Sequence, residues 1–268
     1  MEQKVIIITG ASSGIGLACA RKFSLHGYKV VLAARSLDKL CAIQEQMLSY
    51  NPHVIAIKAD VSVEEDCRKL IEETVKNFGR IDILINNAGI SMRALFKDLD
   101  LKVLHTLMDT NFWGTVHCTK YALPYILECK GSIVGVSSIA GFMGLPGRTG
   151  YSASKFAMHG FLETIRVEHL KQHLHVMIVA PGFTTSNIRK SALAADGNMQ
   201  GETPRDENKM MPAEKVADYI YNGVVRRKRQ IILTVKGKLG VMLKRVVPSL
   251  IDYFDYMEMK KEPNSPLV

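Results

Sequence analysis

The sequence has few cysteines and no long apolar run, and each shortage excludes a class of protein. The five cysteines are odd in number and scattered, and none forms a Cys-x-x-Cys pair. This distribution argues against a disulfide framework, and it predicts reduced thiols and a cytoplasmic location. No stretch reaches the roughly 18 apolar residues that a membrane-spanning helix needs. A secretory leader is not expected, because the first apolar stretch runs directly into a glycine-rich turn.

Acidic residues are absent from residues 224–245, where lysine and arginine concentrate much of the net charge of +9. A solvated basic edge is the simplest interpretation, and peripheral contact with an anionic membrane surface is the alternative. Nucleic acid is not expected as a partner, because no recognition motif accompanies the charge. No metal site is expected either, since His169 and His173 lie one helical turn apart without a third ligand in a recognisable pattern.

The 268 residues, of which 47% are apolar and 23% charged, suit one globular domain with a substantial core. Apolar, β-branched runs alternate with amphipathic segments, which predicts a parallel sheet with helices on both faces. The strand runs are continuously apolar, as in sheets that are buried on both sides. We expect strands at 5–8, 29–33, 54–57, 81–85, 132–136, 175–179 and 230–234, and helices at 15–26, 37–50, 63–78, 101–127, 151–172 and 213–226.

Seven such strands with right-handed crossovers predict an α/β fold, namely a single-domain Rossmann fold with a doubly wound, seven-stranded parallel sheet across residues 1–268. Residues 182–211 interrupt the alternation, and we expect them to form a substrate lid or a mobile loop. Residues 237–268 are a C-terminal extension with apolar residues at helical spacing that Pro248 interrupts. The stretch 262–266, which contains two prolines, is expected to be disordered.

Three glycines follow the first expected strand and open the first helix. Gly10, Gly14 and Gly16 permit a tight turn and a close approach of the backbone to a pyrophosphate. The helix that begins near Ile15 points its free amides and the positive end of its dipole at that phosphate. The spacing Gly-x3-Gly-x-Gly departs from the general dinucleotide fingerprint, but its place between a strand and a helix predicts a dinucleotide site.

The end of the second expected strand carries no carboxylate. An NAD enzyme needs an acidic residue there to hold the ribose hydroxyls, whereas this chain has Arg35 followed by Ser36. The planar guanidinium of Arg35 suits a 2′-phosphate, and Ser12 and Ser36 add hydroxyl donors. These residues predict NADP(H) rather than NAD(H). The alternative, that Arg35 is only a surface residue, leaves the missing acid unexplained.

Tyr151 and Lys155 are four residues apart on an expected helix, so their side chains share one face. An ammonium beside a phenol favours the phenolate, and we therefore expect Lys155 to lower the pKa of Tyr151 from about 10. Such a tyrosine protonates a carbonyl oxygen or deprotonates an alcohol. Ser137 and Ser138 follow an apolar strand that ends at Val136, which places them at the carboxyl edge of the sheet, where ligands bind in open α/β folds.

From about residue 4 to residue 233 the chain carries a set of motifs in a characteristic order: the glycine turn at 9–16, Asn86-Asn-Ala-Gly89, Asn111, the paired serines and Tyr151-x3-Lys155. In this it resembles the short-chain dehydrogenase/reductase family. The resemblance implies a nicotinamide-dependent oxidoreductase that interconverts a ketone and a secondary alcohol by hydride transfer. It also implies four catalytic roles: Ser138 polarises the substrate oxygen, Tyr151 is the acid or base, Lys155 holds the nicotinamide ribose, and Asn111 completes a proton relay to Lys155. Ser137 is the alternative to Ser138, and a helix cap or kink is the alternative role of Asn111.

The same resemblance assigns the ligand contacts. The glycine turn would hold the phosphates, Asp60 and Val61 would contact the adenine, and the segment after the sixth strand would meet the nicotinamide. Together with the residues derived above, the expected cofactor site is Gly10, Ser12, Ser13, Gly14, Ile15, Gly16, Arg35, Ser36, Asp60, Val61, Asn87, Ala88, Gly89, Tyr151, Lys155, Pro181, Gly182 and Thr184. The expected substrate contacts are Ser138, Met92, Phe142 and Tyr151.

The small-molecule substrate is expected to be an apolar or lipid-like carbonyl or alcohol compound, because most candidate wall residues are apolar: Ser91, Met92, Leu95, Phe96, Phe142, Met143, Leu145, Thr185 and Ile188. Parts of the chain resemble hydroxysteroid dehydrogenases and long-chain ketosphinganine reductases, which implies a steroid-like or long-chain keto compound. One alternative is a 3-oxoacyl-carrier-protein reductase, against which the chain beyond Leu233 argues. Another is a nicotinamide-sensing binding protein without turnover, against which Tyr151 and Lys155 argue. The resemblance also implies a homodimer or homotetramer built on the helices at 101–127 and 151–172.

Overall fold

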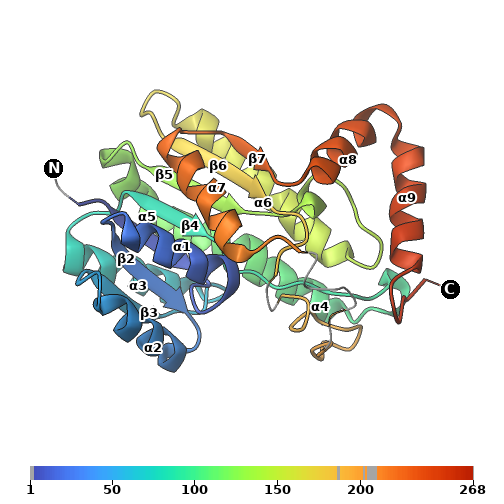
Figure 1. The fold of residues 1–268 in the computed structure, drawn as a ribbon, viewed down its shortest axis with the longest axis horizontal. Coiled ribbons are helices and arrows are strands. Elements are labelled where there is room, and N and C mark those ends of the chain that lie inside the picture. The colour runs from blue at the N-terminus through green and yellow to red at the C-terminus, as the bar shows by residue number, and fades with distance from the viewer. Residues whose placement is uncertain (1–2, 186–187, 202, 204–209, 268) are drawn as a thin grey trace.

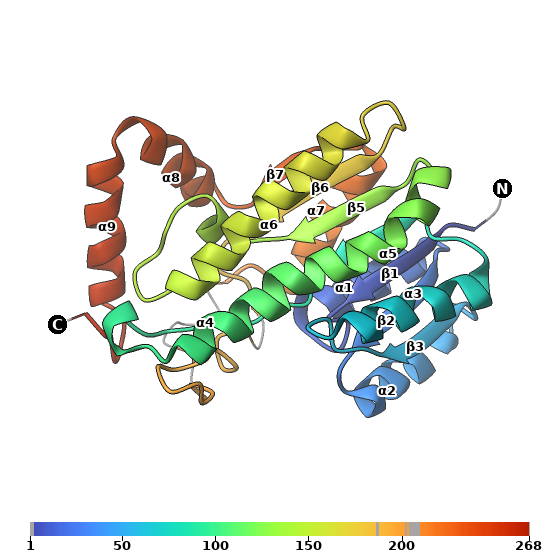
Figure 2. The same ribbon diagram turned by 180° about the vertical axis from the view of Figure 1, so that it is seen from behind.

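The computed structural model describes residues 3–185, 188–201, 203 and 210–267 (Figures 1 and 2). Within them seven parallel strands form one sheet in the order β3-β2-β1-β4-β5-β6-β7. The strands are β1 (Val5–Thr9), β2 (Lys29–Ala34), β3 (Val54–Lys58), β4 (Ile83–Asn86), β5 (Ser132–Val136), β6 (His175–Ala180) and β7 (Gln230–Ile232). The predicted doubly wound sheet is confirmed, because the strand order reverses direction on either side of β1.

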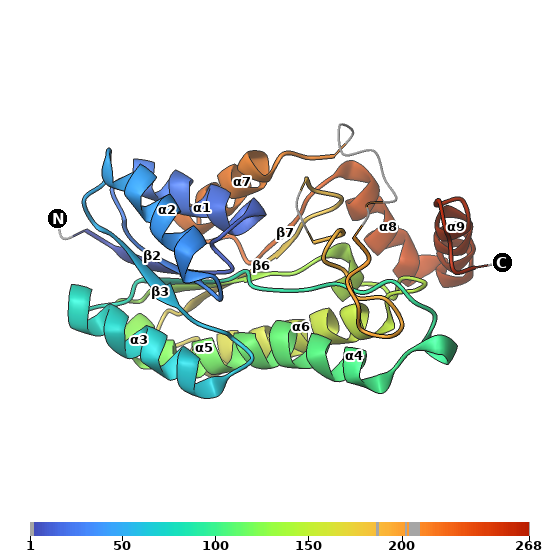
Figure 3. The same ribbon diagram turned by 90° about the horizontal axis from the view of Figure 1, so that it is seen from below.

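Helices cover both faces of the sheet (Figure 3). One face carries α1 (Gly14–Leu25), α2 (Leu37–Leu48) and α7 (Ala213–Val225), and the other carries α3 (Glu64–Phe78), α5 (Gly114–Glu128) and α6 (Thr149–Glu168). Residues alternate along each strand between the two cores. In β1, Ile6 and Ile8 pack toward α1, while Val5 and Ile7 pack toward α3 and α5. A sheet that is buried on both sides needs the continuously apolar strands that the sequence shows.

The long helix expected at 101–127 is one continuous helical rod with a wider turn inside it. It comprises α4 (Leu101–Leu107), a π-helical turn (Met108–Trp113) and α5. Such π-turns are rare and occur frequently at functional sites. This turn contains Asn111, whose side chain is fully buried.

After β7 the chain forms a C-terminal arm of two helices, α8 (Val235–Val246) and α9 (Pro248–Lys260). Pro248 is the first residue of α9, where a missing N–H disturbs no helical hydrogen bond. The end of the arm packs back onto the segment that follows β4. Nη2 of Arg93 lies 3.3 Å from the Glu262 carboxylate, and the two side chains are only 6% and 8% exposed. Nη2 also donates to the Pro263 carbonyl at 2.7 Å. The expectation of disorder at 262–266 is therefore wrong, because a buried ion pair holds this stretch in place.

The basic residues of 224–245 do not form one surface. Residues 226–229 lie at the amino end of the sheet, where Arg227 donates to the carbonyls of Lys130 and His173, just before β5 and β6. The remaining basic residues lie in α8, beyond the carboxyl end of β7. The basic residues of 224–245 are thus divided between opposite ends of the strands.

The expected lid, 182–211, is described only in part, since residues 186–187, 202 and 204–209 lie outside the described residues. Its middle pairs with the segment after β4, where the Leu193 N–H donates to the Ser91 carbonyl at 2.8 Å and the Arg93 N–H to the Leu193 carbonyl at 2.9 Å. The described part of this segment is thereby fixed beside the candidate substrate wall.

Candidate active site

The turn between β1 and α1 forms a cradle that only glycine permits. Gly10 and Gly14 have φ angles of +66° and +53°, a region that other residues adopt at a cost. A Cβ on Gly16 would lie 2.3 Å from the Gly10 carbonyl oxygen. Ser13 precedes α1 in an extended conformation, and its side chain makes no capping hydrogen bond. The first amides of α1 are therefore suited to an anionic phosphate group, as the sequence predicts.

Thr9, at the end of β1, fastens the segment after β4 to this cradle. Its hydroxyl oxygen accepts the N–H groups of Asn87 and Ala88, both at 3.0 Å. The Asn87 side-chain amide donates back to the Thr9 carbonyl at 2.9 Å. Sequence reasoning assigned Asn87 and Ala88 to the cofactor but missed Thr9, whose only signal is a polar residue that ends an apolar strand.

The carboxyl ends of β2 and β3 lie beside the glycine turn. The Ala11 N–H donates to the Ala33 carbonyl at 3.1 Å, which brings the turn to the end of β2. Arg35 follows there with an exposed side chain, and Ser36 is half-buried. Asp60 follows β3, and its carboxylate accepts from the backbone N–H of Ser62 at 3.0 Å and from the Ser62 hydroxyl at 2.7 Å. This edge thus presents an exposed guanidinium group and a carboxylate that is already hydrogen-bonded.

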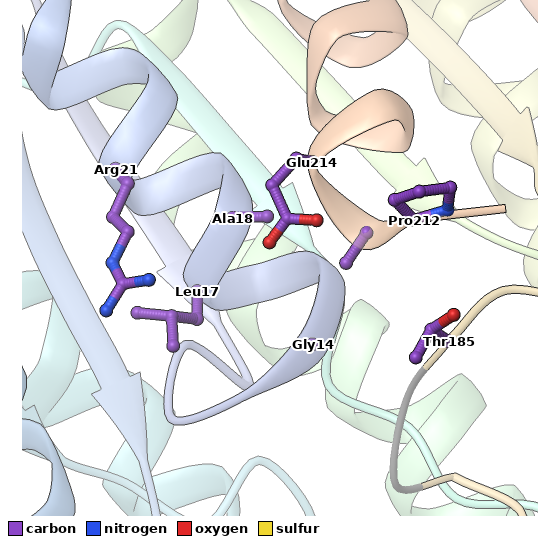
Figure 4. Close-up of a pocket in the computed structure, with 8 residues that line it drawn as sticks. Gly14, Leu17, Ala18, Arg21, Thr185, Pro212 and Glu214 are labelled. Atoms are coloured by element: carbon purple, nitrogen blue, oxygen red, sulfur yellow. The ribbon is translucent and has the colours of Figure 1, made fainter. Parts of the chain in front are cut away.

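A pocket of about 280 Å³ opens beside the glycine turn (Figure 4). It lies between the first turns of α1 and α7 and the segment after β6, and its lining includes Gly14, Thr185 and Glu214. Thr185 is held there because its N–H donates to the Met211 carbonyl at 3.0 Å. The two described ends of the expected lid therefore meet next to the phosphate cradle.

Tyr151 and Ser138 face each other across the end of β5. Burial raises the pKa of Tyr151, and a hydrogen bond with Ser138 and the nearby Arg148 guanidinium oppose that rise. Lys155 lies with Nζ 5.9 Å from the centre of the Tyr151 ring and donates to the Val136 carbonyl at 3.0 Å. The expectation that Lys155 lowers the pKa of Tyr151 is wrong in this structure, because burial dominates and the opposing groups are Ser138 and Arg148.

Arg148 is a site residue that sequence reasoning missed. It lies three residues before Tyr151, at the start of α6, and its guanidinium also donates to Ser91 and to the Met92 carbonyl. Its position at the i−3 spacing from Tyr151 was the available signal. Lys155 is itself almost fully buried, and burial lowers its pKa to about 8.

Asn111 and Lys155 converge at Gly89. The Asn111 amide donates to the Ile90 carbonyl at 3.0 Å and to the Ser154 hydroxyl at 2.9 Å, and its oxygen accepts the Ile90 N–H at 2.8 Å. A Cβ on Gly89 would lie 3.0 Å from Asn111 Oδ1 and 3.4 Å from Lys155 Nζ. Asn111 therefore lies both in an irregular turn of its helix and beside Lys155, where a relay residue would have to be.

The two candidate serines have different partners. The Ser137 hydroxyl lies 2.6 Å from Nε2 of His159, and both residues are buried. Burial lowers the pKa of His159 to about 4, and the charge of Lys155 adds to this effect. Because Ser137 is hydrogen-bonded to His159 while Ser138 is hydrogen-bonded to Tyr151, the geometry favours Ser138 over Ser137 as the serine that would contact the substrate. His159 was not singled out, although it lies one helical turn after Lys155.

Four residues of the expected substrate wall lie in two apolar clusters. Met92 is fully buried in a cluster with Leu107 that also contacts Tyr151, and the Met92 sulfur accepts the Gly150 N–H at 3.3 Å. Phe142 packs into a second cluster with Met143 and with residues of the arm. Met92 thus supports the start of α6 from inside, while Phe142 keeps part of its surface exposed.

The segment after β6 holds the last expected cofactor residues. Thr184 is buried, and its hydroxyl donates to the Gly182 carbonyl at 3.3 Å.

Nowhere in the described ranges do three His, Cys, Asp or Glu side chains gather as a metal site would require. No helix in the part that the structure covers is long and apolar enough to cross a membrane.

Comparisons with known proteins agree with this geometry. Residues 4–197 match the family described as short chain dehydrogenase. An Arabidopsis thaliana protein named 11-beta-hydroxysteroid dehydrogenase 1A is 35% identical over 258 residues, which cover 93% of this chain and 74% of the relative. A Dictyostelium discoideum protein named dehydrogenase/reductase SDR family protein 7-like is 32% identical over 262 residues, which cover 95% of this chain and 81% of the relative.

Two solved structures share the fold at 22% sequence identity. An alcohol dehydrogenase from Thermococcus sibiricus, complexed with 5-hydroxy-NADP, has a TM-score of 0.77 and covers 87% of this chain and 96% of its own. A short chain dehydrogenase/reductase from Burkholderia phymatum, in complex with NAD, has a TM-score of 0.83 and covers 93% and 95%. One of these neighbours contains an NADP derivative and the other NAD, so the fold alone does not select the cofactor.

Proposed function

The chain belongs to the short-chain dehydrogenase family, and from that premise we propose that it is an NADP(H)-dependent oxidoreductase that interconverts an apolar ketone and a secondary alcohol. The observation that carries the proposal is the joint arrangement of Tyr151, Ser138 and Lys155 at the carboxyl edge of the sheet, beside the glycine cradle. The cofactor supplies the hydride, and the protein supplies position and electrostatics.

In reduction, Ser138 donates a hydrogen bond to the carbonyl oxygen of the substrate, and Tyr151 delivers a proton to the same atom. A raised pKa keeps Tyr151 protonated at neutral pH, which is the state that an acid needs. In oxidation Tyr151 takes the proton, and the Ser138 hydrogen bond and the Arg148 charge favour the phenolate. Lys155 holds the nicotinamide ribose, and Asn111, which lies beside it at Gly89, completes a proton relay through water to Lys155.

NADP(H) rather than NAD(H) is proposed from the end of β2. The exposed Arg35 guanidinium has the planar geometry and charge for a 2′-phosphate, and it stands directly after β2, where an NAD enzyme has a carboxylate for the ribose hydroxyls. The substrate is proposed to be steroid-like or a long-chain ketone. One apolar cluster packs against Tyr151 and the other packs against Phe142, and relatives are named hydroxysteroid dehydrogenases. Five free thiols support the proposed cytoplasmic location.

Fluorescence titration with NADPH and NADH tests the cofactor assignment. We expect tighter binding of NADPH, and we expect Arg35→Ala to weaken NADPH about tenfold to a hundredfold, as loss of a charge-assisted hydrogen bond does. NADH affinity should change less than about twofold. Lys39→Ala, which removes another exposed cation on the next helix, is the matched control and should leave the ratio unchanged. A preference for NADH in the wild-type protein would refute the assignment.

A panel of steroid and long-chain ketones with NADPH then tests the reaction. We expect turnover by the wild-type protein and none by Tyr151→Phe, with the NADPH dissociation constant of the variant unchanged. A Tyr151→Phe variant as active as wild type would disprove the mechanism. Cofactor binding without turnover of any compound would instead support a nicotinamide-sensing protein.

A further inference from the structure

Helix α8 presents an apolar stripe to solvent. Val235, Leu239, Met242 and Val246 follow each other at spacings of four, three and four residues, so they share one face of the helix. Their exposed fractions are 83%, 48%, 59% and 74%. The opposite face is the one that packs on the protein. A surface helix of a globular protein normally shows the reverse pattern, with its apolar face inward.

The inner face of α8 lies over the segment that carries Ser138. A Cβ on Gly237 would meet Ile139 Cδ1 at 2.6 Å, and Val241 clusters with Met143 and Ile251. The Thr234 hydroxyl caps the helix by accepting the Gly237 N–H at 3.1 Å. These contacts fix the rotation of α8 about its axis and hold the apolar stripe outward. In Figure 1 the arm extends beyond the end of the sheet, away from α1 to α3.

Basic residues border the stripe on both sides. At 100° per residue, Lys236 lies on one flank, and Lys238 and Arg245 lie on the other, and all three are exposed. Helix α8 carries no acidic residue. Lys244 lies away from the stripe and pairs with Asp252 of α9. An exposed apolar stripe between cationic flanks is the pattern of a helix that lies in a lipid interface, with its lysines reaching the headgroups.

We propose that α8 is a docking surface for an anionic lipid bilayer, on which it lies parallel to the membrane plane. Its 12 residues span only about 18 Å, too short for the hydrocarbon core of about 30 Å. A second copy of the chain fits this face less well, because two-fold pairing would bring the cationic flanks of two α8 helices together. Docking places the segment after Ser138 between the bilayer and the catalytic site. Lipid binding itself does not depend on the proposed reaction.

Co-sedimentation of the full chain with vesicles tests this surface without any turnover measurement. We expect binding to vesicles rich in phosphatidylglycerol, and loss of binding in Leu239→Glu/Met242→Glu. Lys236→Gln/Lys238→Gln/Arg245→Gln should weaken binding about a hundredfold, as expected for three cations near an anionic surface. The control is Leu25→Glu/Val167→Glu, which charges side chains that are 68% and 69% exposed on other helices. Circular dichroism and thermal melting verify that every variant is folded.

Three results would overturn the proposal. The first is absence of wild-type binding to anionic vesicles at low salt. The second is equal binding by the α8 and control variants. The third is a fall in molar mass in solution when Leu239 and Met242 are replaced, which would make the stripe an interface between copies of the chain.

Discussion

At the scale of single residues, the acidity of Tyr151 is set by its surroundings rather than by its partner in the sequence motif. Burial raises the pKa of Tyr151, and the hydrogen bond with Ser138 is the largest opposing influence. The spacing of Tyr151 and Lys155 predicted a shared helix face, and this was correct. It could not predict that the Lys155 ammonium would turn to the Val136 carbonyl, because that carbonyl belongs to a strand distant in sequence.

The pH profile of alcohol oxidation should report the contribution of Ser138. Oxidation needs deprotonated Tyr151, so its rate rises as pH passes the pKa of the phenol. Ser138→Ala removes the group that lowers this pKa, and we expect the midpoint to move to higher pH and kcat to fall about a hundredfold or more. Stopped-flow oxidation between about pH 6 and pH 11, a range that brackets the ordinary tyrosine pKa of about 10, checks both effects. Ser137→Ala is the control, and an equal shift in that variant would contradict the assignment.

Lys155 should make stability depend on pH in the alkaline range. Its pKa falls from 10.5 to about 8 on folding, because burial disfavours the ammonium. Between these values the unfolded chain binds more protons, so stability rises with pH and the cost of burial disappears above about 10.5. Lys155→Met removes this cost, which is about 3 kcal/mol at neutral pH. Urea unfolding of both proteins at several pH values checks it. A variant advantage that is constant with pH would show that the ammonium is not the cause.

At the scale of elements, the pattern of apolar residues predicted the strands well, because a local pattern is enough to specify them. Each expected strand is present with its ends within two residues, because continuous apolar runs bounded by polar turns specify buried parallel strands. The tail at 262–266 was mispredicted for the opposite reason. Its order depends on Arg93, far away in sequence, and a proline-containing stretch gives no local sign of such a partner. The π-turn at Asn111 was invisible for the same reason, since its amide bonds to Ile90 and Ser154.

The Arg93–Glu262 pair should stabilise the arm far more than the exposed pair between its two helices. Removing one partner of a buried pair leaves an uncompensated charge, at a cost of about 3–5 kcal/mol. We expect Glu262→Gln to expose α9 to limited proteolysis and to lower stability by about that amount. Asp252→Asn, which breaks the exposed pair with Lys244, should cost less than about 1 kcal/mol. Similar proteolysis of the two variants would show that the Arg93–Glu262 ion pair does not hold the arm.

At the scale of the whole molecule, two apolar surfaces lie on different sides of one fold. One is the outer stripe of α8, and the other is the outer surface of α5 and α6, which run side by side along one face in Figure 2. Trp113, which directly precedes α5, and Phe156, on α6, are each 46% exposed there. The two surfaces differ in charge, since only the α8 stripe has cations on both flanks and no acidic residue. They therefore suit different partners.

The surface on α5 and α6 should join copies of the chain. Burying two large aromatic side chains per subunit in an isologous contact gives the apolar centre that a dimer requires. We expect sedimentation velocity to show a dimer or a larger closed assembly, and Trp113→Glu/Phe156→Glu to yield the 29.8 kDa monomer. Leu239→Glu/Met242→Glu serves as the matched control and should leave the assembly intact, because it charges the other surface. A wild-type protein that sediments only as a monomer would refute the contact. An assembly lost in the α8 variant and kept in the aromatic variant would place the subunit interface on the arm. The apolar stripe of α8 would then be buried between subunits and could not contact lipid.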